Sequence, residues 1–132
     1  ARFCLMDLYA TLGEMLGGDV PSGLDSRPYP DVLLGKELYR GRDTLLLEAQ
    51  GRLALLSGRY ALIPAYFGED TNSPGIELGC IPHDSLWDLE ADPSQREDLS
   101  FSEKETTARL KKDFLSLASG YYHPGMPTDP LE

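Results

Sequence analysis

The sequence has few of the residues from which self-contained catalytic or metal sites are usually built. Its 132 residues include two cysteines, two histidines and one tryptophan. Cys4 and Cys80 define no spacing motif, and two unrelated thiols are favoured over a disulfide. Asn72 is followed by Ser73 and Pro74, so it does not form an N-glycosylation sequon. None of these features indicates a cellular compartment.

Long hydrophobic runs and an excess of cations are also missing. No apolar stretch approaches the ~20 residues that span a bilayer. The 12 basic residues face 22 acidic ones, and the net charge of -10 repels nucleic-acid phosphates and anionic lipid headgroups. We therefore expect neither a nucleic-acid partner nor a membrane partner. Any chemistry on an anion would need cations from another part of the protein.

What the chain does contain is typical of one ordinary domain. With 41% hydrophobic and 26% charged residues, it can fold around one modest core. Residues 1–7 read like the middle of a longer chain, so we expect the N-terminus to be a cut. Apolar residues at three- and four-residue steps predict a core-facing amphipathic helix over 5–16, which Gly17 and Gly18 end. The proline- and glycine-rich stretch 20–42 predicts an extended connection, with one helical turn at 32–34.

The next stretch predicts an antiparallel sheet. Three five-residue apolar runs, at 45–49, 52–56 and 59–63, are separated by the turns Gln50-Gly51 and Ser57-Gly58. A fourth strand is expected at 85–89, after a long loop over 65–83. Because these runs are nearly continuous in apolar residues, both faces of the sheet are expected to be covered, and the isolated chain to be marginally stable or to associate.

A helix is expected over 103–118. Ser102 and Glu105 fit a capping box, Leu110, Phe114 and Leu117 form the apolar stripe, Lys111 belongs to the solvated face, and Gly120 ends the helix. The predicted fold class is thus α+β, a small four-stranded antiparallel sheet with a packed C-terminal helix.

No catalytic constellation is complete in the chain. Cys80 and His83 could supply half of a zinc site or a nucleophile–base pair, but neither arrangement is completed, and a packed or hydrogen-bonded loop histidine is the ordinary interpretation. The acidic residues around Glu97 and Asp98 lack the spacing of a calcium loop. We therefore expect no catalytic residue, no metal ligand and no cofactor in this chain.

Three blocks of sequence carry a resemblance to a known family. Residues 7–12 resemble the Asp-Leu-x-x-Thr-Leu helix start of type I sulfatases, the arylsulfatase family, and residues 53–63 resemble that family's Leu-Ala-Leu-Arg-x-Gly-x-Trp-Lys-Leu-Ile hairpin. Residues 86–99 are similar to its Leu-Tyr-Asp-Leu-x-x-Asp-Pro-x-Glu-x-x-Asn-Leu block, which precedes a final helix. The chain departs from the family at Leu56, Tyr60, Ala61 and Asp98, where Arg, Trp, Lys and Asn are usual.

The resemblance implies the C-terminal part of an alkaline-phosphatase-like sulfatase fold. Residues 1–42 would be the end of the catalytic domain with a connecting segment, and residues 43–132 a C-terminal subdomain. The parent enzyme would hydrolyse sulfate esters with a cysteine-derived formylglycine and a calcium ion, both in a larger N-terminal domain that would be this chain's partner. Cys80-Ile81-Pro82-His83-Asp84 matches only part of the Cys-x-Pro-x-Arg motif of formylglycine, because Asp84 stands where Arg is needed.

The same resemblance suggests a role for the loop 65–83. Family loops of this kind can form the rim of the substrate pocket, so Tyr66 and His83 are expected to face a sulfated small molecule or glycan. This chain alone is expected to be inactive, and a periplasmic, lysosomal or secreted location is implied for the parent. The alternative is a non-catalytic α+β module that binds another protein through its apolar sheet face.

Overall fold

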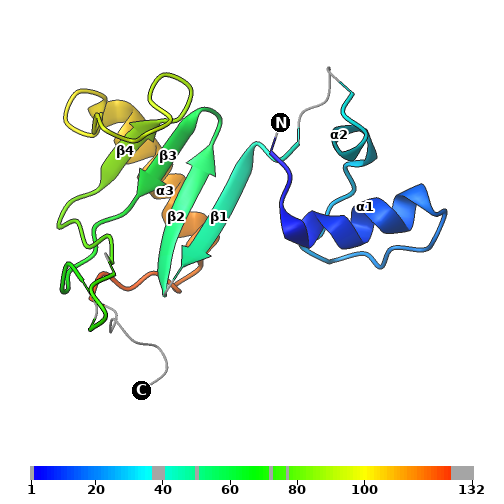
Figure 1. Ribbon diagram of the computed structural model, residues 1–132, viewed down its shortest axis with the longest axis horizontal. Coiled ribbons are helices and arrows are strands. Elements are labelled where there is room, and N and C mark those ends of the chain that lie inside the picture. The colour runs from blue at the N-terminus through cyan, green and yellow to red at the C-terminus, as the bar shows by residue number, and fades with distance from the viewer. Residues whose placement is uncertain (1, 37–40, 50, 72, 77, 126–132) are drawn as a thin grey trace. The chain divides into compact units, whose positions relative to one another are not determined.

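The computed structural model describes residues 2–36, 41–49, 51–71, 73–76 and 78–125. The chain divides into two compact units, Ala1–Asp43 and Thr44–Glu132. Within the described residues, no helix is both long and apolar enough to cross a membrane. Figure 1 labels the elements of both units.

The first unit is helical. A 3-10 turn, η1 (Leu5–Asp7), leads directly into α1 (Leu8–Met15), and a short α2 (Pro30–Leu33) follows a long connection. Gly17 ends the first helix with a φ of 68°, a conformation that glycine adopts without strain. The predicted helix and the predicted helical turn are therefore confirmed.

The buried face of α1 is not the one that the sequence predicts. Ala10 and Thr11 are fully buried, whereas Leu5 and Leu16, at the two ends of the predicted stripe, are 81% and 84% exposed. Hydrogen bonds explain which face is buried, because they hold the connection after α1 against the helix face that carries Thr11. The predicted core-facing stripe is thus an exposed apolar face of this unit.

The second unit is a four-stranded antiparallel sheet with one helix on it, and it confirms the predicted fold class. The strands β1 (Thr44–Ala49), β2 (Arg52–Ser57), β3 (Tyr60–Ile63) and β4 (Ser85–Asp88) lie in the order β1-β2-β3-β4. Ala49 pairs with Arg52 across the first hairpin, and the Gln50 of the predicted turn lies outside the described residues. Because Ser57 pairs with Tyr60, the second turn is Gly58-Arg59 rather than the predicted Ser57-Gly58.

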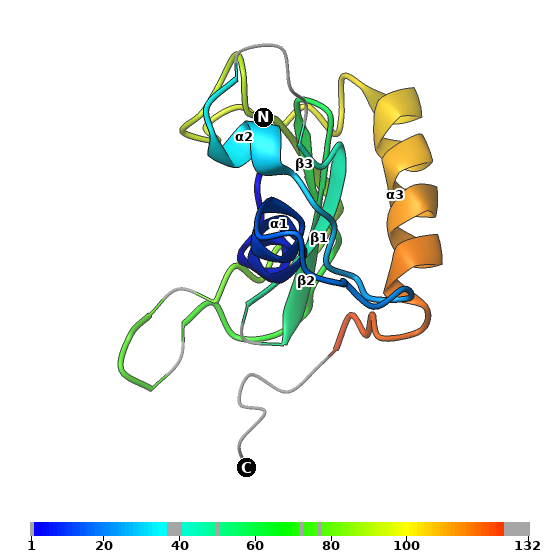
Figure 2. The ribbon, with the colours of Figure 1, turned by 90° about the vertical axis from the view of Figure 1, so that its right-hand side faces the viewer.

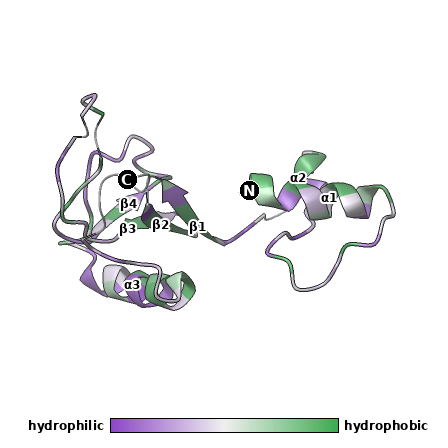
Figure 3. Ribbon diagram, turned by 90° about the horizontal axis from the view of Figure 1, so that it is seen from below, coloured by the Kyte–Doolittle hydropathy of each residue, from purple (hydrophilic) through white to green (hydrophobic). Residues whose placement is uncertain are grey.

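The helix α3 (Lys104–Ala118) runs along one face of this sheet (Figures 2 and 3). The register aligns Leu55, Leu62 and Leu86 across three neighbouring strands, and all three are fully buried. The helix meets this row with Leu110, Phe114 and Ala118. Hydrophobic burial of this row against the helix forms the core of the unit.

Three details of α3 differ from the prediction. Glu103 occupies the N-cap position and there is no capping box: the Ser102 hydroxyl donates to the Leu99 carbonyl instead. Leu117 is 51% exposed, and Ala118, one residue further on, takes its place in the core. Lys111 is bound in an ion pair with Asp84 rather than solvated.

Candidate functional site

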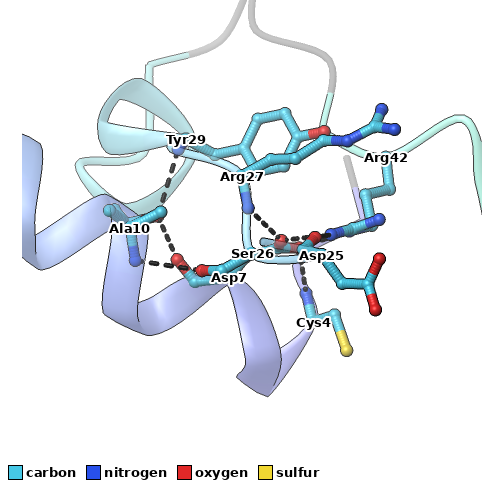
Figure 4. Close-up of polar contacts among 9 residues, drawn as sticks. Cys4, Asp7, Ala10, Asp25, Ser26, Arg27, Tyr29 and Arg42 are labelled. Atoms are coloured by element: carbon cyan, nitrogen blue, oxygen red, sulfur yellow. Dashed lines mark hydrogen bonds and ion pairs between the residues drawn. The ribbon is translucent and has the colours of Figure 1, made fainter. Parts of the chain in front are cut away.

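The most densely bonded polar centre of the first unit is the Asp7 carboxylate (Figure 4). Arg42 donates to it twice, from Nε to Oδ2 at 2.7 Å and from Nη2 to Oδ1 at 2.6 Å. The amides of Arg27 and Cys4 donate to the same two oxygens at 2.9 and 3.4 Å. A buried carboxylate is stable only when it is paired and hydrogen-bonded, and Asp7 meets both conditions.

Electrostatics agree with this geometry. Burial acts to raise the pKa of the Asp7 carboxyl, but the bonds from Arg42, Arg27 and Cys4 outweigh it and hold that pKa below its ordinary value of 3.8. Asp7 is therefore ionised at neutral pH, and Arg42 neutralises it. With its two oxygens shared by four donors, this carboxylate acts as a structural anchor.

Thr11, one helical turn after Asp7, is a second anchor of this unit and acts through its hydroxyl. Thr11 Oγ1 donates to the Asp7 carbonyl at 2.6 Å and accepts from the Tyr29 amide at 3.0 Å. The Ala10 amide donates to Ser26 Oγ at 3.0 Å. These contacts explain the Asp and Thr of the first sequence block, because each fixes the connection 25–29 to α1.

His83, one of the two predicted substrate-facing residues, lies two residues before β4, and its side chain contacts a second carboxylate, that of Asp98. Its Nε2 is 3.0 Å from Asp98 Oδ2, and its ring centroid is 5.1 Å from that of Phe101. The His83 side chain is 43% exposed. The predicted hydrogen-bonded loop histidine is confirmed, while contact with a substrate stays a prediction.

Asp98 is the residue of this pair that sequence reasoning missed. Its Oδ1 accepts from the Leu86 amide at 3.0 Å and from the Ser100 amide at 2.8 Å. Burial acts to raise the Asp98 pKa, but these amides and His83 outweigh it and lower that pKa. The available signal was its position in the third sequence block, where the family has Asn. An Asn side-chain oxygen can accept the same two amide bonds.

A matched pair of substitutions tests this role of Asp98. Asp98→Ala should lower the unfolding free energy of the second unit by about 1–3 kcal/mol, because it leaves the Leu86 and Ser100 amides unpaired. Asp98→Asn keeps the acceptor oxygen and should cost less than about 1 kcal/mol. Urea unfolding followed by Trp87 fluorescence measures both. Equal losses for the two variants would contradict the role.

Tyr66, the other predicted substrate-facing residue, is 2% exposed. Its hydroxyl accepts from the Leu53 amide of β2 at 2.5 Å, and its ring meets Tyr122 edge-on. Tyr66 and His83 share no hydrogen bond or ring contact in the part of the chain that the structure describes. Tyr66 as a substrate contact also stays a prediction.

Cys80 does not form a pair with His83 either. Its thiol accepts from Arg52 Nη2 at 2.9 Å, and both cysteines are free thiols. Across the described ranges, no group of three or more His, Cys, Asp or Glu side chains could hold a metal ion. The described residues therefore do not fit the calcium ion that the resemblance implies for the parent enzyme.

Comparison with known proteins gives a sequence relative. No family model matches the chain. An N-acetylgalactosamine-6-O-sulfatase of Bacteroides thetaiotaomicron is 29% identical over 121 residues, which cover 85% of this chain and 22% of that protein. The chain thus spans about a quarter of the length of the relatives it matches.

Solved structures of similar fold include bacterial sulfatases. A Bacteroides thetaiotaomicron structure (BT33336S-sulf), from work on the metabolism of multiple glycosaminoglycans, matches with a TM-score of 0.76 and 26% identity, over 86% of this chain and 24% of its own. BT1596, a 2-O GAG sulfatase, shares the fold with a TM-score of 0.54 and 18% identity, over 86% of this chain and 25% of its own. The order of the sequence blocks, the sheet with its final helix and these matches agree that the chain is similar, over most of its length, to the C-terminal part of sulfatases.

Proposed function

We propose that this chain is the C-terminal part of an enzyme that hydrolyses sulfate esters, and that it serves there as scaffold and as part of the substrate-pocket rim. The observation that carries the proposal is the match of 85% of the chain to an N-acetylgalactosamine-6-O-sulfatase. The residues 1–42 would belong to the catalytic domain and the residues 43–132 to the C-terminal subdomain.

The chemistry itself would be supplied by the rest of the protein. By resemblance, the nucleophile would be a formylglycine made from a cysteine, and a calcium ion held by that other domain would supply positive charge for the sulfate oxygens. Cys80 is a poor candidate for that cysteine, because Asp84 replaces the Arg of the motif. The net charge of -10 agrees with this division, since the cations that bind a sulfate would come from the other domain.

The exposed apolar residues support a larger folded body. On α1, the apolar side chains that are more than 40% exposed are Tyr9, Leu12 and Met15. In the second unit, α3 covers one sheet face, and on the opposite face Leu47 of β1 is 41% exposed, whereas Leu45 of the same face is buried and Trp87 is half-buried. The Trp87 indole nitrogen is buried without a hydrogen-bond partner in the described structure. An N-terminal catalytic domain is the partner that we propose for these surfaces.

We propose a sulfated glycan as the substrate, because matched proteins are named as an N-acetylgalactosamine-6-O-sulfatase and a 2-O GAG sulfatase. The test is sulfate release from N-acetylgalactosamine-6-sulfate by the complete protein, made in a host that forms formylglycine. The 132-residue chain alone is the control and should release none. A complete protein that releases no sulfate from this sugar or from a panel of sulfated glycosaminoglycan saccharides would overturn the proposal and favour the interaction module.

The two histidines of the chain provide a matched test of the pocket rim. In the complete protein, His83→Ala should raise KM about tenfold with little change in kcat, as expected when one hydrogen bond to the substrate is lost. His123→Ala, in the exposed tail, should leave both constants unchanged. Equal effects of the two substitutions, or none from His83→Ala, would remove His83 from the rim.

A further inference from the structure

The loop 65–83 is closed at its base by contacts between its own two ends. The Ala65 amide donates to Asp84 Oδ1 at 2.8 Å, and the Tyr66 amide donates to the Ile81 carbonyl at 2.8 Å. The residues where the chain leaves β3 and re-enters β4 are therefore tied together. Because its two ends are bonded to each other, the loop leaves and re-enters the sheet at one fixed place.

Helix α3 and the residues that follow it, 119–125, also bind the two ends of the loop. Lys111 Nζ donates to Asp84 Oδ1 at 2.6 Å, so one carboxylate oxygen binds both the helix and the loop. The Tyr122 hydroxyl donates to the Ala65 carbonyl at 2.6 Å, and the Phe67 amide donates to the Pro124 carbonyl at 2.7 Å. Both polar groups of Ala65 are thus bound, one by Asp84 and one by Tyr122.

The Tyr122 ring is itself anchored in the core. It meets Phe114 of α3 and Tyr66 of the loop edge-on, with centroid distances of 5.1 and 5.5 Å. Lys111 Nζ lies 4.5 Å from the Tyr122 ring centroid, a cation–π contact. Tyr122 therefore links the buried face of α3 to the first residues of the loop.

We infer that Tyr122, Lys111 and Asp84 form a clamp that sets the position of the loop 65–83, and that they are positioning residues for the substrate-pocket rim. The second half of this inference rests on the proposed function. Tyr122 and Lys111 touch the base of the loop and would act on substrate only through it. The clamp predicts that loosening the loop weakens substrate binding while the sheet and the reacting groups stay in place.

The test of the clamp is Tyr122→Phe, which keeps the ring and removes only the hydroxyl that binds Ala65. Hydrogen exchange of the 132-residue chain should show roughly tenfold faster exchange at the Phe67 and Tyr66 amides, with β2 and β3 amides unchanged. Tyr121→Phe is the control, because the neighbouring Tyr121 is 78% exposed. Unchanged exchange in Tyr122→Phe, or an equal change in Tyr121→Phe, would overturn the clamp.

The complete protein tests the positioning role separately. Tyr122→Phe should raise KM for the sulfated sugar about three- to tenfold and leave kcat nearly unchanged, because binding rather than chemistry depends on the loop. A normal KM together with a loosened loop would overturn the positioning role and leave the sulfatase proposal intact. An inactive wild-type protein would remove the substrate half of the inference, while the exchange result would still decide the clamp.

Discussion

Replacing Asp7 with alanine is expected to destabilise the first unit by about 3–5 kcal/mol. The substitution leaves the Arg42 guanidinium, whose side chain is 10% exposed, without its counter-ion. It also leaves the Arg27 and Cys4 amides without their acceptor. Because domains are stable by only about 5–15 kcal/mol, a small helical unit should lose most of its order.

The readout for this unit is local, since the single tryptophan lies in the other one. Hydrogen exchange at the Ala10 and Tyr29 amides, which bind Ser26 and Thr11, reports on it directly. Asp31→Ala is the matched control: its partner Lys36 is 62% exposed, and such pairs contribute less than about 1 kcal/mol. Equal acceleration of exchange in Asp7→Ala and Asp31→Ala would contradict the anchoring role of Asp7.

The pH dependence of stability provides a second test of the anchoring role of Asp7. The pKa of Asp7 is lower in the folded unit than its ordinary 3.8, so the stability it contributes is fully present above about pH 4 to 5 and is lost as pH falls through the folded pKa. Exchange at the Ala10 and Tyr29 amides, corrected for its intrinsic pH dependence, should therefore show loss of protection below pH 4. Asp7→Asn should remove most of that pH dependence.

The sheet could be predicted from the sequence because its signals are local. Five-residue apolar runs separated by glycine-containing pairs predict three short strands and the two hairpins that join them. The positions of Gly51 and Gly58, with φ of 74° and 53°, agree with that interpretation. The sequence pattern predicts the second turn one residue too early, because Ser57 and Arg59 flank the same glycine. The pairing of Ser57 with Tyr60 across the strands shows that the turn is Gly58-Arg59.

The burial of α1 could not be predicted in the same way, because it depends on partners far away in the sequence. In the sequence, Asp7 and Thr11 stand out only as part of a family pattern, because their partners Arg42 and Tyr29 lie 35 and 18 residues away. Apolar periodicity alone cannot show that a carboxylate and a hydroxyl select the buried face. The same holds for Asp84, Lys111 and Tyr122, three ordinary surface-type residues that long-range folding brings to one loop base.

The start of α3 shows a related limit. A Ser-x-x-Glu pattern predicts a capping box, but the Glu103 carboxylate accepts a hydrogen bond from the Tyr60 hydroxyl at 3.0 Å. The Leu99 carbonyl accepts the amides of Ser102 and Glu103, which closes the turn before the helix. Tertiary contact with β3 thus accompanies a helix start one residue later than the local pattern predicts.

Phe114→Ala is expected to lower the unfolding free energy of the second unit by about 3–5 kcal/mol. Phe114 is fully buried between the row of leucines on the sheet and the Tyr122 ring, so its removal combines lost apolar burial with a cavity that rigid neighbours cannot fill. Urea unfolding followed by Trp87 fluorescence measures the loss.

The control for Phe114 is Leu117, which the sequence pattern places in the same buried stripe. The structure has Leu117 half-exposed and Ala118 fully buried, so Leu117→Ala should cost no more than about 1 kcal/mol. The sequence periodicity places both Phe114 and Leu117 in the core. A difference in stability between the two variants therefore distinguishes the observed buried face of α3 from the predicted one. A Leu117→Ala loss as large as that of Phe114→Ala would mean that Leu117 is buried in solution, by rotation of α3 or by association through its outer face.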